Sequence, residues 1–275
     1  MATDNVLEIK NLHTYFYTDG GVIKAVDGVD VELRRGATLG IVGESGSGKS
    51  VTSLSVMGLL AGTKGKIADG EILLDGDDIV KLTKEQQRKL RGSKISMIFQ
   101  EPMTALNPVF RIGEQVDEIT KLHNPDMSKE QVKARTIEML KLVGIANSEG
   151  VYKMYPHELS GGMRQRVGIA MAMTFNPELL LADEPTSALD VTIQKQVVEE
   201  MLLMREEYGT AMIVVTHNIG VVEKMADKVL VLKNGKVREY GKTAQVLTAP
   251  EDPYTKELMS SVPRLKRTGT GNGGR

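Results

Sequence analysis

The segment that most constrains this chain is glycine-rich and runs from Gly43 to Ser50, with the sequence GESGSGKS. It fits the pattern G-x-x-x-x-G-K-[ST], follows the apolar run 38–42 and precedes a helical pattern over 49–60. Glycines let the backbone curl until successive N–H groups face one anion, and a helix N-terminus adds the positive end of its dipole. A turn that binds nothing is the alternative, but the strand–loop–helix context disfavours it. The segment therefore predicts a nucleotide-phosphate site.

Individual residues of this phosphate loop have separate expected roles. Lys49 would reach the β- and γ-phosphates, and Ser50 would bind Mg²⁺ through its hydroxyl. The full set of expected nucleotide contacts from the loop is Gly43, Glu44, Ser45, Gly46, Ser47, Gly48, Lys49, Ser50 and Val51.

Two acidic residues, Asp183 and Glu184, follow the apolar run 179–182. Ligands of open parallel sheets sit at the carboxyl ends of the strands. We therefore expect Asp183 to hold Mg²⁺ or its water, and Glu184 to polarise an attacking water as a general base. Taken alone, the pair could equally cap the helix start that follows at Pro185. The phosphate loop makes the catalytic interpretation the stronger one.

A serine-glycine segment formed by Ser160, Gly161, Gly162 and Met163 precedes another helical pattern. A hydroxyl and free backbone N–H groups at a helix N-terminus predict a second anion site by the same physics. A plain helix start with Ser160 as N-cap is the alternative. Because one chain needs only one γ-phosphate site, a second site makes sense if it completes the nucleotide site of another protomer.

Strand and helix patterns alternate around these segments, which predicts an α/β domain with a mostly parallel sheet. Extended runs at 6–12 and 22–33 open the chain, and Asn234-Gly235 is a strong hairpin signal. From about 102 to 157 the pattern is mostly helical, with an amphipathic stretch at 129–143. A helical insertion in an alternating chain predicts a helical subdomain.

Composition excludes several functional classes. The 275 residues include no cysteine, which excludes a disulfide scaffold, a thiolate nucleophile and a Cys-held iron–sulfur cluster. With 35 Lys and Arg against 36 Asp and Glu, the formal net charge is −1, so nucleic acid is not an expected partner. The N-terminus lacks a signal-peptide pattern, and no run is long enough to span a membrane. We expect a cytoplasmic location, with any membrane role exerted through another chain.

These motifs, in this order, resemble those of the nucleotide-binding subunit of an ABC transporter. The resemblance covers about residues 6 to 262 and rests on six segments. They are Gly43 to Ser50 (the family's Walker A), 179–183 (Walker B), 159–163 (signature), Gln100 (Q-loop), 187–190 (D-loop) and His217 (switch histidine).

The resemblance implies a fold as well as a site. It implies an α/β P-loop NTPase core with a mostly parallel sheet, an N-terminal antiparallel β region and a helical subdomain. The expected single ABC ATPase domain spans 1–265, with 1–101 and 158–265 as core plus β region and 102–157 as the helical subdomain. A disordered tail is expected over 266–275.

It also implies roles for further residues, with ATP and Mg²⁺ as cofactors. Two subunits would pair head to tail, each ATP lying between one chain's phosphate loop and the other's Ser160 segment. Phe16 would stack on adenine, with Tyr15 and Tyr17 as neighbours able to substitute. The remaining assignments are Glu184, His217 and Gln100 for catalysis, Ser50, Gln100 and Asp183 for Mg²⁺, and Ser187 and Asp190 for the D-loop.

Within the family, the segment 100–108 (QEPMTALNP) resembles the importer group for oligopeptides, dipeptides and nickel. Met163 in the signature and the late 252–255 (DPYT) favour the same group, closest to the first ATPase of the peptide systems. The implied function is the ATP-hydrolysing motor of a peptide importer at the cytoplasmic face of the membrane. Nickel or glutathione as cargo, or a soluble non-transport ABC ATPase, are the alternatives.

The resemblance implies partners too. They are a second, related ATPase (or a second copy), two integral membrane permeases and, indirectly, an extracytoplasmic binding protein. Many members of this group continue after 263–265 into a Cys-bearing extension. Because this chain has no cysteine, we expect no iron–sulfur cluster.

Overall fold

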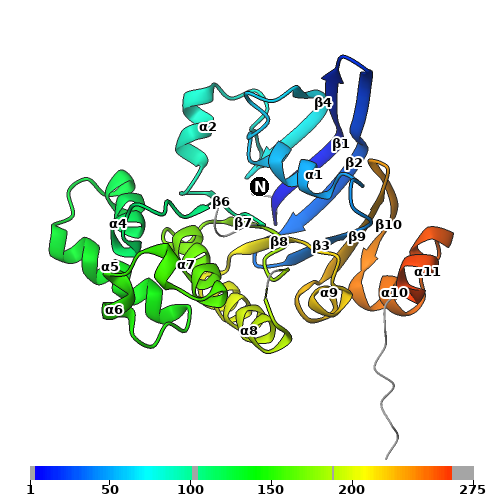
Figure 1. Ribbon diagram of the computed structural model, residues 1–275. Coiled ribbons are helices and arrows are strands. Elements are labelled where there is room, and N and C mark those ends of the chain that lie inside the picture. Colours follow the sequence, from blue (N-terminus) through cyan, green and yellow to red (C-terminus); the bar gives the residue numbers. More distant parts are fainter. Residues whose placement is uncertain (1–3, 101–104, 188, 262–275) are drawn as a thin grey trace, which may run out of the picture.

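Two β-sheets lie on either side of the helix that follows the phosphate loop (Figure 1). The computed structural model describes residues 4–100, 105–187 and 189–261. Helix α1 (Lys49–Val56) contacts β1 and β2 of one sheet and β7 and β8 of the other. The loop before α1 is therefore held at the junction of the two sheets.

The N-terminal sheet is antiparallel, as expected. Predicted runs 6–12 and 22–33 lie within its two longest strands, which are joined by a tight turn at Asp19 and Gly20. In spatial order its strands are β2 (Gly21–Arg34), β1 (Asn5–Thr18), β4 (Gly65–Leu74) and β5 (Asp77–Asp78).

The second sheet is mostly parallel, as expected. Only its edge strand β10 runs antiparallel, paired with β9 through the predicted turn at Asn234 and Gly235. In spatial order its strands are β10 (Lys236–Lys242), β9 (Lys228–Lys233), β3 (Thr38–Val42), β8 (Ala211–Val215), β7 (Leu179–Asp183) and β6 (Ile95–Ile98).

Continuous apolar runs in the parallel strands reflect burial on both faces of the sheet. In β7, Leu179 and Leu181 belong to the core between the two sheets, whereas Leu180 and Ala182 belong to the core under the helices. This period of two follows from the alternating direction of side chains along a strand.

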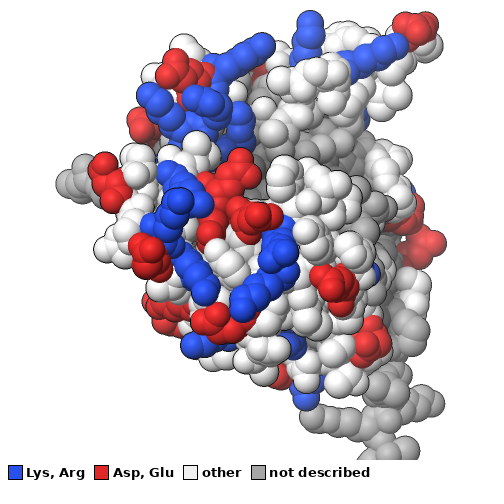
Figure 2. All heavy atoms as spheres, turned by 60° about the vertical axis from the view of Figure 1, so that its left-hand side comes forward, with Lys and Arg blue, Asp and Glu red and all other residues white. Residues whose placement is uncertain are grey.

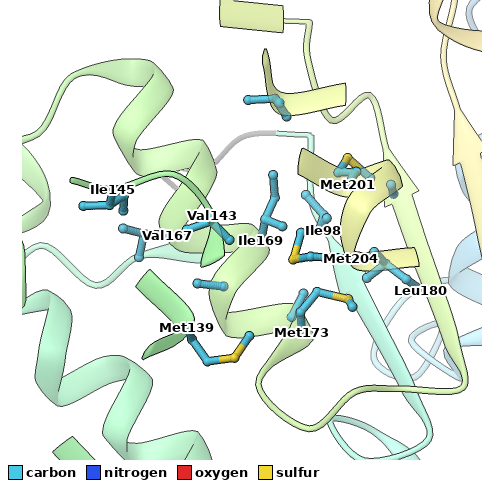
Figure 3. Packing of buried hydrophobic residues seen from close by; sticks show 14 of the residues in the cluster. Ile98, Met139, Val143, Ile145, Val167, Ile169, Met173, Leu180, Met201 and Met204 are labelled. Atoms are coloured by element: carbon cyan, nitrogen blue, oxygen red, sulfur yellow. The ribbon is translucent and has the colours of Figure 1, made fainter. Parts of the chain in front are cut away.

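Helices cover the other face of the parallel sheet (Figure 1). Figure 3 shows Met139, Met173, Met201 and Met204 in the core beneath them, in the same cluster as Ile169. All four methionines are buried, and the flexible, unbranched side chain of methionine fills irregular gaps well. The helices on this side include α4 (Ile112–His123), α5 (Lys129–Leu142), α6 (Ser148–Tyr152), α7 (Gly161–Met173) and α8 (Val191–Tyr208), with the short η1 (Pro156–Glu158) before α7.

Helix ends follow local capping signals. Helix α5 begins after the N-cap Ser128 and is followed by Gly144 at φ +72°. The predicted helix 49–60 is wrong at its end: α1 stops at Val56, and Gly58 at φ +63° turns the chain away. The other helices are α2 (Lys84–Leu90), α9 (Ile219–Met225), α10 (Thr243–Thr248) and α11 (Pro253–Ser260).

The boundaries 102–157 of the expected helical subdomain stay a prediction. Helix α7 packs on both α4 and α5, so the helical region shares one core with the sheet. Segment 101–104 and the tail 266–275 lie outside the described residues. Among the helices of the described ranges, none has the length and apolar character that crossing a bilayer requires.

Candidate nucleotide site

A cavity of about 340 Å³ lies where the phosphate loop leaves β3 and enters α1. Its wall brings together segments that are far apart in the chain: the loop itself, part of β2, and the residues that follow β6, β7 and β8. The lining residues are Ala25, Ser45, Gly46, Gly48, Lys49, Ser50, Val51, Gln100, Glu184 and His217.

Two glycines of the loop are required by close backbone packing. At Gly43 (φ +147°) an added Cβ would lie 2.2 Å from the carbonyl oxygen of Leu232, and at Gly48 (φ +106°) 2.3 Å from that of Ala25. The carbonyl of Ser47 accepts a hydrogen bond of 2.9 Å from the backbone N–H of Gly235. The backbones of β2 and β9 and of the β9–β10 turn thus fix the curl of the loop.

Lys49 is buried at the base of this cavity. Its Nζ donates to the carbonyl oxygens of Gly43, at 2.8 Å, and Glu44, at 2.9 Å. Burial lowers the pKa of the Lys49 ammonium, while the carboxylates of Glu184 and Asp183 oppose that shift. A desolvated cation held against the loop is well suited to bind a phosphate oxygen.

Ser50 and Asp183 meet at the junction of α1 and β7. The Ser50 hydroxyl donates to Asp183 Oδ1 over 3.0 Å. Burial raises the pKa of Asp183, and the hydrogen bond from Ser50 opposes the rise. A carboxylate and a hydroxyl are hard oxygen ligands of the kind that Mg²⁺ takes, so this pair fits the expected metal.

Glu184 is held in an unusual backbone conformation, with φ +48°. Its N–H donates to the carbonyl of Val215 over 2.8 Å, which anchors it to β8. Its Oε1 lies 2.8 Å from His217 Nδ1, and its Oε2 accepts from the Thr216 hydroxyl at 3.3 Å. Non-glycine residues with positive φ are costly and cluster at functional sites.

His217 and Gln100 reach the same cavity from two other strands. The His217 side chain is 70% exposed, whereas that of Glu184 is 11% exposed, so the imidazole lies toward the opening and the carboxylate deeper inside. Gln100 follows β6 and is also exposed. Most of the predicted loop residues thus line one cavity with Glu184, Gln100 and His217. The predicted loop and acidic residues that are not among its lining are Gly43, Glu44, Ser47 and Asp183.

The predicted signature residues do not line this cavity. Ser160 is exposed and acts as N-cap of α7, its hydroxyl accepting from the Met163 N–H at 3.3 Å. Helix α7 therefore begins directly after Ser160, at Gly161. An added Cβ at Gly161 would meet nothing within 4 Å, while one at Gly162 would lie 2.8 Å from Ile193. The N-terminus of α7 is thus open on one side.

Phe16, expected to stack on adenine, also lies outside the cavity lining. It is half-buried in β1, opposite Ile23 of β2 and Gly65 of β4. Its neighbour Tyr15 donates its hydroxyl to Asp27 over 2.7 Å, while Tyr17 is 47% exposed. The adenine role of Phe16 stays a prediction.

Both named D-loop residues connect to neighbouring site elements. The hydroxyl of Ser187 donates to the carbonyl of Glu184 over 3.2 Å. Asp190 caps α8 by accepting from the N–H groups of Thr192 at 3.1 Å and Ile193 at 3.0 Å. Ala188 lies outside the described residues.

Two residues at the site were not foreseen from the sequence. Thr216 bonds Glu184, and its place directly before His217 was an available signal. Ala25 lines the cavity from β2. It sits in a long extended run that carries no mark of a binding residue, so only the folded chain reveals it.

Comparison with known proteins decides the family. The sequence profile of the ABC transporter family matches residues 26–187, which is more than half of the chain. The chain belongs to the ABC transporter ATPase family. This ABC ATPase is 49% identical to the oligopeptide transport ATP-binding protein AppD of Bacillus subtilis, over 94% of this chain and 78% of that protein. It is 47% identical to the dipeptide transport ATP-binding protein DppD of the same organism, over 97% of this chain and 79% of that protein.

A solved structure agrees with this assignment. It is a dimeric ATP-binding cassette in a post-hydrolysis state bound to ADP and Pi, with a TM-score of 0.77 at 32% identity. The alignment covers 86% of this ABC ATPase and 98% of the other chain. The predicted fold class and family are therefore confirmed.

Proposed function

We propose that this ABC ATPase is the motor subunit of a peptide importer, coupling ATP hydrolysis to uptake across the membrane. The observation that supports this best is the identity of 47–49% to both an oligopeptide and a dipeptide transport ATP-binding protein, over nearly the whole chain. The similarity extends beyond the shared motifs, into the helical region and α11. It therefore favours a shared cargo class, and not only a shared ATPase activity.

In this proposal the cavity binds ATP with Mg²⁺. Lys49 and the loop N–H groups bind the phosphates, while Ser50, Asp183 and Gln100 hold the metal or its waters. Bound Mg²⁺ would neutralise charge on the phosphate oxygens. Glu184 accepts the proton of the attacking water, and His217, hydrogen-bonded to Glu184 Oε1 at 2.8 Å, orients that carboxylate and contacts the γ-phosphate.

A second subunit completes each site in this proposal. Ser160 lies at the exposed N-terminus of α7, outside the cavity of its own chain. A head-to-tail partner would present its own Ser160 segment, with Gly161, Gly162 and Met163, to the bound phosphates. The dimeric state of the related cassette with ADP and Pi supports this arrangement. The partner is a related ATPase or a second copy.

Membrane permeases are the further proposed partners, docked on the helical region. Val109 and Leu122 are 71% and 75% exposed, and Phe110 is 51% exposed beside a cavity that Glu118 and Lys121 also line. Exposed apolar groups close together mark interaction sites.

On the side that includes α2, α4 and α5, Figure 2 shows Lys and Arg interspersed with Asp and Glu. Mixed charge of this kind does not favour nucleic acid as a partner.

Uptake in the native host tests the proposal. A strain lacking this chain should lose uptake of a labelled tripeptide, and the wild-type gene but not the Glu184→Gln gene should restore it. Uptake of labelled Ni²⁺ or glutathione is measured in parallel. Loss of either in place of peptide uptake would move the cargo assignment to that compound. Unchanged uptake of all three, with no permease co-purifying, would favour a non-transport ATPase.

A further inference from the structure

Tyr254 of the C-terminal helix α11 reaches the phosphate loop. Its hydroxyl oxygen accepts a hydrogen bond of 3.1 Å from the backbone N–H of Glu44, a residue 210 positions earlier in the chain. The sequence marks this tyrosine only as part of the 252–255 segment that favours the peptide importer group. The proposed mechanism makes no use of it.

Several contacts fix Tyr254 in place. Asp252 caps α11 by accepting from the Tyr254 N–H at 2.8 Å, and the Glu239 carboxylate of β10 accepts from the Asp252 N–H at 3.2 Å. The Tyr254 side chain is 7% exposed and packs in a cluster that includes Val42, the last residue of β3. Lys233 Nζ lies 4.0 Å from the ring centroid. The hydroxyl therefore meets the loop from a rigid support.

The Glu44 residue is held on two sides. Its N–H is bound by Tyr254 from the outside of the loop, and its carbonyl accepts from Lys49 Nζ at 2.9 Å from the inside. Burial raises the pKa of Tyr254, so the hydroxyl stays un-ionised at neutral pH. Glu44 thus connects helix α11 with Lys49, the residue expected to bind phosphate.

We propose that Tyr254 is a positioning residue for the phosphate loop and that helix α11 thereby sets the affinity for nucleotide. The inference rests on the nucleotide site proposed above. Without the hydroxyl, the empty loop can relax and turn the Glu44 N–H toward water. The nucleotide-bound loop cannot relax in this way, so the lost hydrogen bond appears as weaker binding.

Tyr254→Phe isolates this effect because it keeps the packed ring and removes only the acceptor. In the full chain, the Kd for Mg-ATP should rise about three- to tenfold. KM for ATP should rise by a similar factor while kcat stays within about twofold, because saturating nucleotide reorders the loop. Amide hydrogen exchange over 43–49 in the nucleotide-free protein should become faster.

Tyr240→Phe is the matched control. The Tyr240 hydroxyl donates to the Glu32 carbonyl over 3.0 Å and accepts from Lys228 Nζ at 3.4 Å, and this Nζ lies 5.2 Å from the ring centroid. This variant loses a comparable tyrosine hydrogen bond between two elements, but outside the nucleotide cavity. It should leave both the Kd for Mg-ATP and loop exchange at wild-type values.

The outcomes separate the inference from the function on which it rests. Equal Mg-ATP affinity in Tyr254→Phe and wild type overturns the positioning role. The same loss in both variants also overturns it, since it would report general destabilisation. Failure of the wild-type protein itself to bind Mg-ATP contradicts the proposed nucleotide site instead.

Discussion

Glu184 shows how the functional chemistry depends on one backbone position. Its register on β7 places it beyond Asp183, which pairs with Val215 of β8. The bond from the Glu184 N–H to the Val215 carbonyl, 2.8 Å long, then turns its side chain toward Thr216 and His217. Glu184, which directly follows the candidate metal ligand Asp183, therefore points into the cavity.

Glu184→Gln should reduce ATP hydrolysis by about a hundredfold or more, since an amide cannot accept the proton of the attacking water. ATP affinity should stay within a few fold, because Gln has the same size and can still contact Thr216 and His217. Phosphate release and equilibrium nucleotide binding measure the two quantities. Turnover at the wild-type rate would contradict the general-base assignment.

The buried carboxyl of Asp183 should make the stability of the nucleotide-free protein depend on pH. Burial raises its folded-state pKa above the ordinary value of 3.8, so folding takes up a proton as this group titrates. Its contribution to stability therefore falls as pH rises from the unfolded pKa through the raised folded pKa.

Asp183→Asn should stabilise the nucleotide-free protein at neutral pH, because it removes a buried charge, while abolishing Mg²⁺-dependent hydrolysis. The stability difference should be smaller at acidic pH than at neutral pH, because the wild-type carboxyl regains its proton as the pH falls through its raised pKa. Urea unfolding with a chelator present, at both pH values, measures this. A difference that does not vary with pH would contradict the stated cause.

At the scale of elements, the phosphate loop needs a positive φ at Gly48 and also packs closely against the backbone of β2 at this residue. Gly48→Ala would place a Cβ 2.3 Å from the Ala25 carbonyl at φ +106°. We expect ATP affinity to fall more than about tenfold, as the loop must move to relieve this clash. Isothermal titration with Mg-ATP measures it.

Gly62→Ala provides the control for backbone strain alone. Gly62 has φ +87°, and an added Cβ there would meet nothing within 4 Å. It should lower stability slightly and leave ATP affinity unchanged. Equal affinity losses in the two variants would show that strain, rather than loop geometry, is responsible.

The elements themselves follow largely from the sequence. The run 211–215 matches β8, because a buried strand of a parallel sheet is apolar on both faces and ends where polarity returns. The predicted end of α1 is wrong, since apolar residues continue to Leu60 although the helix stops at Val56 and Gly58 turns the chain away. Contacts such as Thr216 with Glu184 and Tyr254 with Glu44 depend on strand order and register, which local patterns do not encode.

For the whole molecule, the open N-terminus of α7 is the feature that bears on assembly. Ser160→Arg in the Glu184→Gln background should abolish ATP-dependent dimerisation. The arginine side chain would occupy the position proposed for the phosphates of the ATP that the partner subunit binds. Light scattering with and without ATP measures the dimer. A dimer that forms normally would argue against the shared site.

Ser128→Arg is the matched control for loss of a helix cap. Ser128 caps α5 as Ser160 caps α7, each hydroxyl accepting a backbone N–H at 3.3 Å, and both residues are exposed. The control should lose a similar amount of stability, about 1 kcal/mol, and retain ATP-dependent pairing.

The order of strands in the parallel sheet has a consequence for the newly made chain. The strand that leads into the phosphate loop, β3, lies between β8 and β9, both encoded in the last quarter of the sequence. Synthesis proceeds from the N-terminus, so the motif at 43–50 leaves the ribosome long before either neighbouring strand exists. A nascent chain therefore cannot complete the sheet around the phosphate loop until β8 and β9 have been synthesised, and products that terminate before these strands carry the motif without its two neighbouring strands.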